Sequence, residues 1–151
     1  MPDTQQKPDA AELLRRTRIE VAPSAFVLVR LTHPAWARLL EQPELSPRAD
    51  APFMLLSDAH EVTLLLEEED WRAMRHAARG ARVESGFRLL TLNLELDWQV
   101  VGYLARVTGI LAEARVSVGA LTAFSRDHLL VKQADLPAAL RALGPHVAEL
   151  C

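Results

Sequence analysis

The stretch FRLLTLNLEL at residues 87–96, followed by VVGYLARVTGILAEA at residues 100–114, decides the fold. In the first stretch apolar and polar residues alternate, which is typical of a strand with one face in a core. The apolar row of that strand consists of Leu90, Leu92, Leu94 and Leu96. In the second stretch apolar residues recur every three or four positions, which predicts a helix over residues 99–114 that packs on a sheet. The members of this helical stripe are Val100, Leu104, Val107, Leu111 and Ala114. We expect Gly109 to let this helix approach its neighbours closely.

The rest of the second half continues with two strands and a helix. Apolar runs predict strands at residues 116–124 and 128–132, joined by a tight polar turn. We expect Asp135 to cap a helix with one apolar stripe. The order strand, helix, strand, strand, helix is typical of a ferredoxin-like unit, in which an antiparallel sheet carries both helices on one face. No clear strand follows Val147, so we expect the two halves of the chain to share or exchange strands.

The first half repeats this order of elements with little residue identity. A buried strand is predicted at residues 25–31, followed by a short helix and a β-hairpin formed by residues 53–56 and 62–66. The acidic run at residues 67–70 opens a second helix, because carboxylates in a first helical turn are favoured by the helix dipole. The predicted fold class is α+β, with two ferredoxin-like βαββαβ modules, shared or swapped strands, and antiparallel sheets that carry helices on one face.

The order of the elements divides the chain into three parts. These are an N-terminal arm at residues 1–18, a first module at residues 19–80 and a second module at residues 86–148. Within the arm, residues 1–7 look disordered, and Asp9 can cap a short helix. Gly80 and Gly86 mark the expected linker between the modules.

Charge and composition bear on the partners and location of the protein. The net charge is −3 and basic residues are interspersed with acidic ones, so we do not expect nucleic acid as a partner. The chain has no apolar stretch of membrane-spanning length, and we expect no membrane partner. The N-terminus lacks the apolar segment of a secretory signal, and Cys151, the single cysteine, can form no intramolecular disulfide. A cytoplasmic location is expected.

Motifs for nucleotide cofactors, metal ions and acyl-enzyme chemistry are absent from the sequence. The chain contains neither GxxxxGK[ST] nor GxGxxG, and neither HExxH nor a pair of cysteines. Ser125, Asp127 and His128 are close in sequence, but neighbours on a strand or tight turn project in different directions. We therefore expect no enzymatic activity, no cofactor and no bound metal.

The junction between the strand ending at Leu96 and the helix that follows it offers a possible binding site. Free amides and partial positive charge at a helix N-terminus suit a carboxylate, such as that of an amino acid. Gly102 would let a ligand approach the backbone. An α-amino group then needs an acceptor, and Asp127 is the candidate. Two alternatives remain open from the residues alone: Asp97 can cap the helix itself, and Asp127 can simply stabilise its turn.

Three segments of the second half resemble the ACT domain family. They are VGY at residues 101–103, ILAEARVSV at residues 110–118 and FSRDHLLV at residues 124–131. The resemblance covers about residues 87–147 and is strongest to small bacterial tandem-ACT proteins, which are related to the cytosolic arginine sensors called CASTOR.

The resemblance implies two βαββαβ modules per chain and regulatory binding of a small ligand, usually an amino acid, at a module interface. By position, it places backbone and wall contacts at residues 101–103, a side-chain wall at Phe124 and a polar anchor at Asp127. With the acidic residue at the junction added, the candidate ligand-binding residues are Asp97, Val101, Gly102, Tyr103, Phe124 and Asp127.

Two functional hypotheses follow. The first is a regulatory or sensor module that binds a free amino acid or a similar small metabolite. It would be a homodimer that passes ligand occupancy to a regulated protein through a ligand-dependent arrangement of its modules. The alternative is a structural or protein-interaction module whose pocket is degenerate, with apolar residues such as Trp98 as contact surface.

Overall fold

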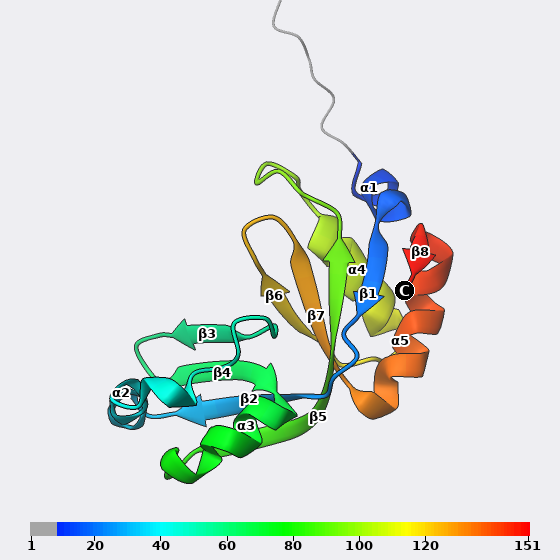
Figure 1. Ribbon diagram of the computed structural model, residues 1–151. Helices are drawn as coiled ribbons and strands as arrows, with labels where there is room; N and C mark the ends of the chain where they lie inside the picture. Colours follow the sequence, from blue (N-terminus) through cyan, green and yellow to red (C-terminus); the bar gives the residue numbers. More distant parts are fainter. Residues whose placement is uncertain (1–8) are drawn as a thin grey trace, which may run out of the picture. The chain divides into compact units, whose positions relative to one another are not determined.

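The computed structural model describes residues 9–151, which divide into two compact units (Figure 1). One, here called the larger unit, combines the chain up to Ala22 with Arg88–Cys151. The other, here called the inserted unit, is Pro23–Phe87. The disorder predicted for residues 1–7 lies outside the described residues.

The larger unit contains three α-helices and a mixed sheet. Its helices are α1 (Ala10–Arg16), α4 (Tyr103–Glu113) and α5 (Leu136–Leu143), with short 3-10 turns η3 (Gln133–Asp135) and η4 (Gly144–His146). Its strands are β1 (Arg18–Val21), the second part of β5 (Arg82–Asn93), β6 (Gly119–Thr122), β7 (Asp127–Lys132) and β8 (Glu149–Leu150). They lie in the order β6-β7-β5-β1-β8.

The last strand position of this ferredoxin-like unit is filled by β1, from the beginning of the chain. β1 pairs antiparallel with β5, with Arg18 opposite Asn93 and Val21 opposite Leu90. The prediction that strands are shared is therefore confirmed. The chain also forms β8 after Val147, where no strand was predicted, and β8 pairs parallel with β1 at the sheet edge.

The core of the larger unit lies between its sheet and its helices. Leu90 and Leu92 of β5 are fully buried, as the alternating pattern predicted. They share one hydrophobic cluster with side chains of α1, α4, α5 and β7, which places these helices on the same face of the sheet (Figure 1). α1 begins as predicted, because the Asp9 side chain accepts a hydrogen bond from the Ala11 amide at 3.3 Å.

The inserted unit is a four-stranded antiparallel sheet with its own helices. Its elements are β2 (Phe26–Leu31), α2 (His33–Leu40), η1 (Pro43–Leu45), β3 (Met54–Ser57), β4 (Val62–Glu67), α3 (Glu68–Met74), η2 (Arg75–Ala77) and the first part of β5. The strands lie in the order β3-β4-β2-β5, so this unit has the complete βαββαβ order. The predicted hairpin is confirmed as β3 and β4.

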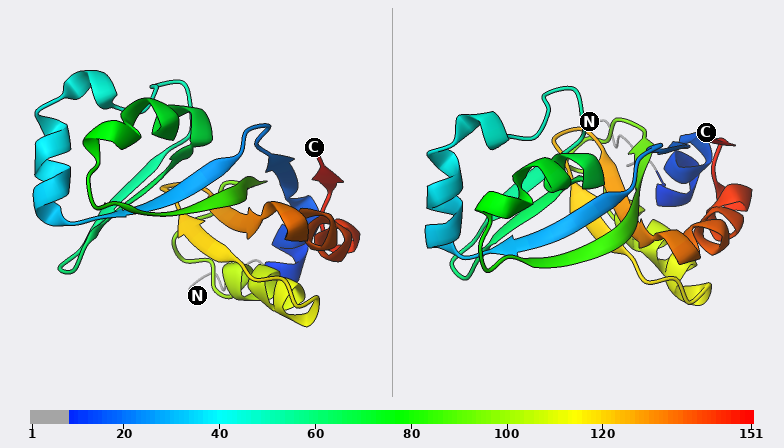
Figure 2. Two further views of the ribbon diagram at one scale, coloured as in Figure 1. Left: turned by 90° about the horizontal axis from the view of Figure 1, so that it is seen from below. Right: turned by 60° about the horizontal axis from the view of Figure 1, so that its bottom comes forward.

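One hydrophobic cluster joins the two helices of the inserted unit to its sheet. The cluster contains alternate residues of β2 and β4 together with Ala35 and Leu39 of α2 and Met74 of α3. α2 and α3 therefore cover the same face (Figure 2). The acidic run at the start of α3 also forms ion pairs with an arginine side chain. Arg48 donates to Asp70 at 2.7 Å and to Glu67 at 2.5 Å.

Four predictions about local structure are wrong. The expected linker is strand from Arg82 onward, because residues 82–87 complete the sheet of the inserted unit beside β2. The helix predicted from residue 99 begins only at Tyr103, after Gly102 adopts a left-handed conformation. A Cβ at Gly109 would meet nothing within 4 Å, so this glycine permits no close packing. Asp135 makes no side-chain capping bond, because η3 precedes α5.

Candidate functional site

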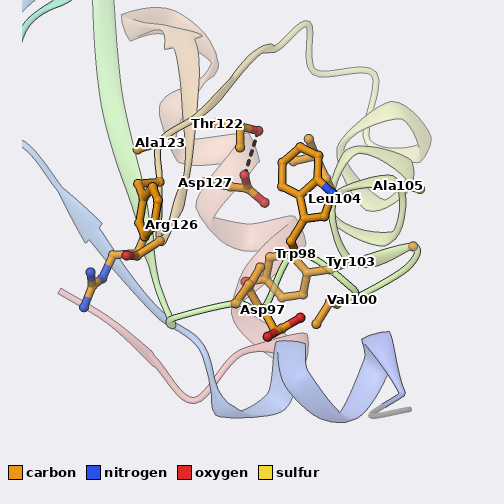
Figure 3. Close-up of a pocket in the computed structure, with 14 residues that line it drawn as sticks. Asp97, Trp98, Val100, Tyr103, Leu104, Ala105, Thr122, Ala123, Arg126 and Asp127 are labelled. Carbon is orange, nitrogen blue, oxygen red and sulfur yellow. Dashed lines mark hydrogen bonds between the residues drawn. The ribbon is translucent and has the colours of Figure 1, made fainter.

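A cavity of about 330 Å³ lies in the larger unit, at the beginning of α4. It is enclosed by the loop between β5 and α4, the first turn of α4, and the turn between β6 and β7 (Figure 3). Five of the six candidate residues line it, namely Asp97, Gly102, Tyr103, Phe124 and Asp127. The volume is at the lower end of the range for small-ligand sites, about 300–1,000 Å³. We call it the main cavity.

The first turn of α4 lines the main cavity. Gly102 precedes the helix with φ 84° and ψ 0°, and no side chain caps this end. The first helical hydrogen bond is donated by the Arg106 amide to the Gly102 carbonyl at 2.9 Å. The amides of Tyr103, Leu104 and Ala105 consequently lack intrahelical acceptors, and all three residues line the cavity. An anionic group placed here gains hydrogen bonds and the favourable end of the helix dipole.

Asp127 forms the opposite, acidic part of the cavity. It is the first residue of β7 and pairs across the hairpin with Thr122 of β6, whose hydroxyl donates to Asp127 Oδ1 at 2.8 Å (Figure 3). The residue is only 8% exposed. Within residues 9–151 the other carboxylate oxygen, Oδ2, has no hydrogen-bond partner. A carboxylate of a largely buried residue that lines a cavity is well placed to accept from a cationic donor.

Asp97 does not cap α4. Its Oδ1 accepts from the Gln99 amide at 2.8 Å, while its carbonyl accepts from the Val100 amide at 3.0 Å. These bonds shape the loop before the helix, which starts several residues later. The alternative that Asp97 caps the helix is therefore wrong, and Asp97 lines the main cavity as part of the loop.

Tyr103 contributes its backbone and its ring to the cavity, while its hydroxyl is already paired. The Tyr103 hydroxyl lies 2.7 Å from Thr17 Oγ1, and Thr17 in turn donates to the Leu13 carbonyl at 3.0 Å. Burial raises the pKa of the Tyr103 phenol, and the hydrogen bond with Thr17 acts in the opposite direction. The ring is 2% exposed and anchors the start of α4 to the N-terminal segment.

Two aromatic side chains at the cavity are exposed, and one candidate lies outside it. Trp98 is 93% exposed and Phe124 is fully exposed, although both line the cavity. Phe124 therefore stands at the rim rather than as a closed wall. Val101 is 74% exposed and is not a lining residue.

Two polar lining residues, Thr122 and Arg126, were not among the candidates from the sequence. Thr122 lies opposite Asp127 in the hairpin of β6 and β7, and only the register of this hairpin identifies it as a neighbour of Asp127. Arg126 follows Ser125 in the turn, but its side chain points away from Asp127 (Figure 3). It donates to Asn93 Oδ1 at 2.8 Å and to Glu95 Oε1 at 3.1 Å, so its charge is already paired. Asp97 and Asp127 are thus the charged side chains that line the cavity without a cationic partner.

Ser125, Asp127 and His128 do not form a hydrogen-bonded triad among the described residues. Asp127 accepts from Thr122, and His128 follows on the strand with its side chain half-buried. Burial lowers the pKa of His128, an effect that Asp127 partly opposes. Over residues 9–151 the structure contains no group of three or more His, Cys, Asp or Glu residues that could hold a metal ion. None of the helices in that range is both long enough and apolar enough to cross a membrane.

Several solved structures share this fold over most of their length. One is a protein from Agobacterium tumefaciens, with 17% identity over 90% of this chain and 92% of that chain, at a TM-score of 0.68. A second is a Vibrio cholerae protein described as a possible transport protein, with 26% identity, coverage of 91% and 95%, and a TM-score of 0.66. A third is the regulatory subunit of aspartate kinase from Thermus thermophilus, with 10% identity, coverage of 88% and 98%, and a TM-score of 0.64.

The sequence itself matches one family. Comparison with curated proteins gave no match. The family described as the ACT domain matches residues 82–144, a range that begins with β5 and contains every residue lining the main cavity. This agrees with the resemblance in the sequence of the second half. Residues 82–144 of this chain are therefore similar to the ACT domain family.

Proposed function

We propose that the main cavity binds the zwitterionic head of a free amino acid or a similar small metabolite. The observation that carries the proposal is the pairing of two opposite features in one cavity. These are the unpaired amides at the start of α4 and the unpaired Oδ2 of buried Asp127.

The chemistry of the two features assigns the orientation of the ligand. The α-carboxylate accepts hydrogen bonds from the amides of residues 103–105, and the α-ammonium group donates to Asp127. Each charge-assisted bond contributes about 1.5–3 kcal/mol when it is shielded from water. Thr122 already donates to Oδ1, which holds the carboxylate in place and leaves Oδ2 for the ligand.

The regulatory part of the proposal is supported by the family and by the neighbouring folds. The match to the ACT domain includes the cavity, and one structural neighbour is a regulatory subunit of aspartate kinase. We propose a non-catalytic protein of the cytoplasm that acts as a homodimer and transmits ligand occupancy to a regulated protein. Transmission requires that the ligand bind one arrangement of the protein more tightly than another.

A second candidate function rests on the exposed residues beside the cavity. Trp98, Val101 and Phe124 expose apolar area that is typical of a protein-interaction surface. In this alternative the cavity is degenerate and the rim binds a protein partner.

A screen of the common amino acids by thermal shift, followed by calorimetry, tests the proposal. We expect at least one amino acid to raise the melting temperature at millimolar concentration or below. Asp127→Asn keeps an acceptor for Thr122 but removes the charge, and should weaken binding at least about tenfold. Asp50→Asn, at an exposed position outside the cavity, is the matched control and should bind as the wild type does.

The outcome separates the two candidates. If the folded protein binds none of the amino acids, the proposed ligand class is wrong. If Trp98→Ala abolishes capture of a protein partner while Asp127→Asn leaves it intact, the interaction function holds instead.

A further inference from the structure

A second, smaller cavity of about 140 Å³ lies in the larger unit and shares no lining residue with the main cavity. Three of its lining side chains carry or can acquire positive charge, and none is acidic. They are Arg15 of α1, Arg106 of α4 and His146 of η4. Leu14, which is buried, and Pro145 add apolar surface. We call this cavity the basic pocket.

The two arginines of the basic pocket have no partner among the described residues. Neither Arg15 nor Arg106 forms an ion pair or a side-chain hydrogen bond with any residue in the range 9–151. Other arginines of the same protein do find carboxylates, among them Arg18, Arg30, Arg48, Arg72 and Arg126. Like charges that converge on one cavity repel each other unless a negative group joins them. An anionic occupant would remove this repulsion.

The position of Arg106 strengthens the argument. Arg15 lies in the last turn of α1, where a cation is favoured by the helix dipole, so its placement has a structural explanation. Arg106 lies at the beginning of α4, where the dipole disfavours a cation. Both arginines are exposed, and an anionic ligand between them would give each a partner that the described residues do not supply.

We propose that the basic pocket binds a single phosphoryl group, either as inorganic phosphate or at the end of a small phosphomonoester. The planar guanidinium groups of Arg15 and Arg106 match the oxygens of phosphate in paired hydrogen bonds, and His146 adds a further donor. The small volume suits one tetrahedral anion. The net charge of −3 disfavours a polyanion. This site is separate from the main cavity, so it does not depend on the function proposed above.

Phosphate titration followed by calorimetry and by the phosphorus NMR signal tests the inference, with ionic strength held constant by chloride. Wild-type protein should bind inorganic phosphate saturably, and glycerol phosphate serves as the phosphomonoester. Tighter binding of glycerol phosphate would identify a metabolite as the ligand, and equal or weaker binding would identify free phosphate. Arg106→Gln and Arg15→Gln should each weaken binding at least about tenfold.

The matched control is Arg16→Gln. Arg16 is next to Arg15 on α1 and is exposed, but it does not line the pocket. This variant should bind phosphate as the wild type does, and circular dichroism should show that all three variants are folded. The inference is overturned if phosphate binding does not saturate, or if all three variants weaken it equally, because the effect is then one of diffuse charge. It is also overturned if anionic vesicles or an oligonucleotide bind far more tightly than phosphate and the same two variants abolish that binding.

Discussion

Replacement of Gly102 by alanine should destabilise the larger unit through the backbone alone. Gly102 has φ 84°, a left-handed conformation that costs an L-residue about 1–2 kcal/mol. A Cβ at this position would meet no atom within 4 Å, so no steric clash adds to the cost. We expect Gly102→Ala to lower the free energy of unfolding by about 1–2 kcal/mol.

Gly109→Ala is a matched control, for which we expect the opposite effect on stability. Gly109 lies inside α4 with a right-handed helical backbone, and a Cβ there also meets nothing within 4 Å. Alanine at a helix-interior position is more favourable than glycine by about 0.5–1 kcal/mol. Gly109→Ala should therefore stabilise the protein, and the two variants should differ by about 1.5–3 kcal/mol.

Equilibrium unfolding in urea, monitored by circular dichroism, measures both effects. The midpoint should fall for Gly102→Ala and rise for Gly109→Ala, with an unchanged slope. Equal stability of wild type and Gly102→Ala would show that residue 102 does not adopt the left-handed conformation. The backbone geometry that starts α4 at Tyr103 would then be wrong.

Three further predictions concern buried polar groups. Tyr103→Phe should cost about 1 kcal/mol in an unfolding experiment, whereas Thr17→Val should cost more, about 1–3 kcal/mol, because it leaves the buried Tyr103 hydroxyl unpaired. Burial lowers the pKa of His128 in the folded protein from its ordinary value of 6.5, so the unfolded chain binds the proton first as the pH falls. The free energy of unfolding should therefore decrease as the pH drops through 6.5. His128→Gln should make this dependence of stability on pH less steep. Arg48→Met should lower the melting temperature, because it leaves both carboxylate oxygens of buried Asp70 without a partner.

Local sequence patterns predicted most elements of secondary structure. The alternation of leucines in β5 identified the buried Leu90 and Leu92, because neighbouring side chains of a strand point to opposite faces. The period of the α4 stripe identified Val107 and Leu111, which are fully buried. The hairpin of β3 and β4 followed from two apolar runs around a polar turn.

The failures arose where long-range pairing overrides a local signal. Glycines at positions 80 and 86 indicated a linker, yet the residues after Gly80 pair with β2 and become strand. The helix that was expected at residue 99 starts four residues later, since the left-handed Gly102 and the bonds of Asp97 hold the preceding loop out of helical geometry.

The candidate site was predicted in part. Asp127, Gly102 and Tyr103 were identified and do meet in one cavity. The sequence could not reveal that the Tyr103 hydroxyl is already bonded to Thr17, a residue 86 positions away. It also could not reveal that Arg126 turns away towards Asn93 and Glu95.

The sequence by itself determined the types and order of most elements, the buried residues Leu90, Leu92, Val107 and Leu111, and the similarity of residues 82–144 to the ACT domain family. Only the tertiary structure decided that β1 completes the sheet beside β5, and that Asp127 shares a cavity with the free amides of α4. The physical reason is that burial periodicity is a property of neighbouring residues. Strand pairing and the assembly of a binding site depend on contacts between residues far apart in the chain. A local sequence pattern does not contain this information.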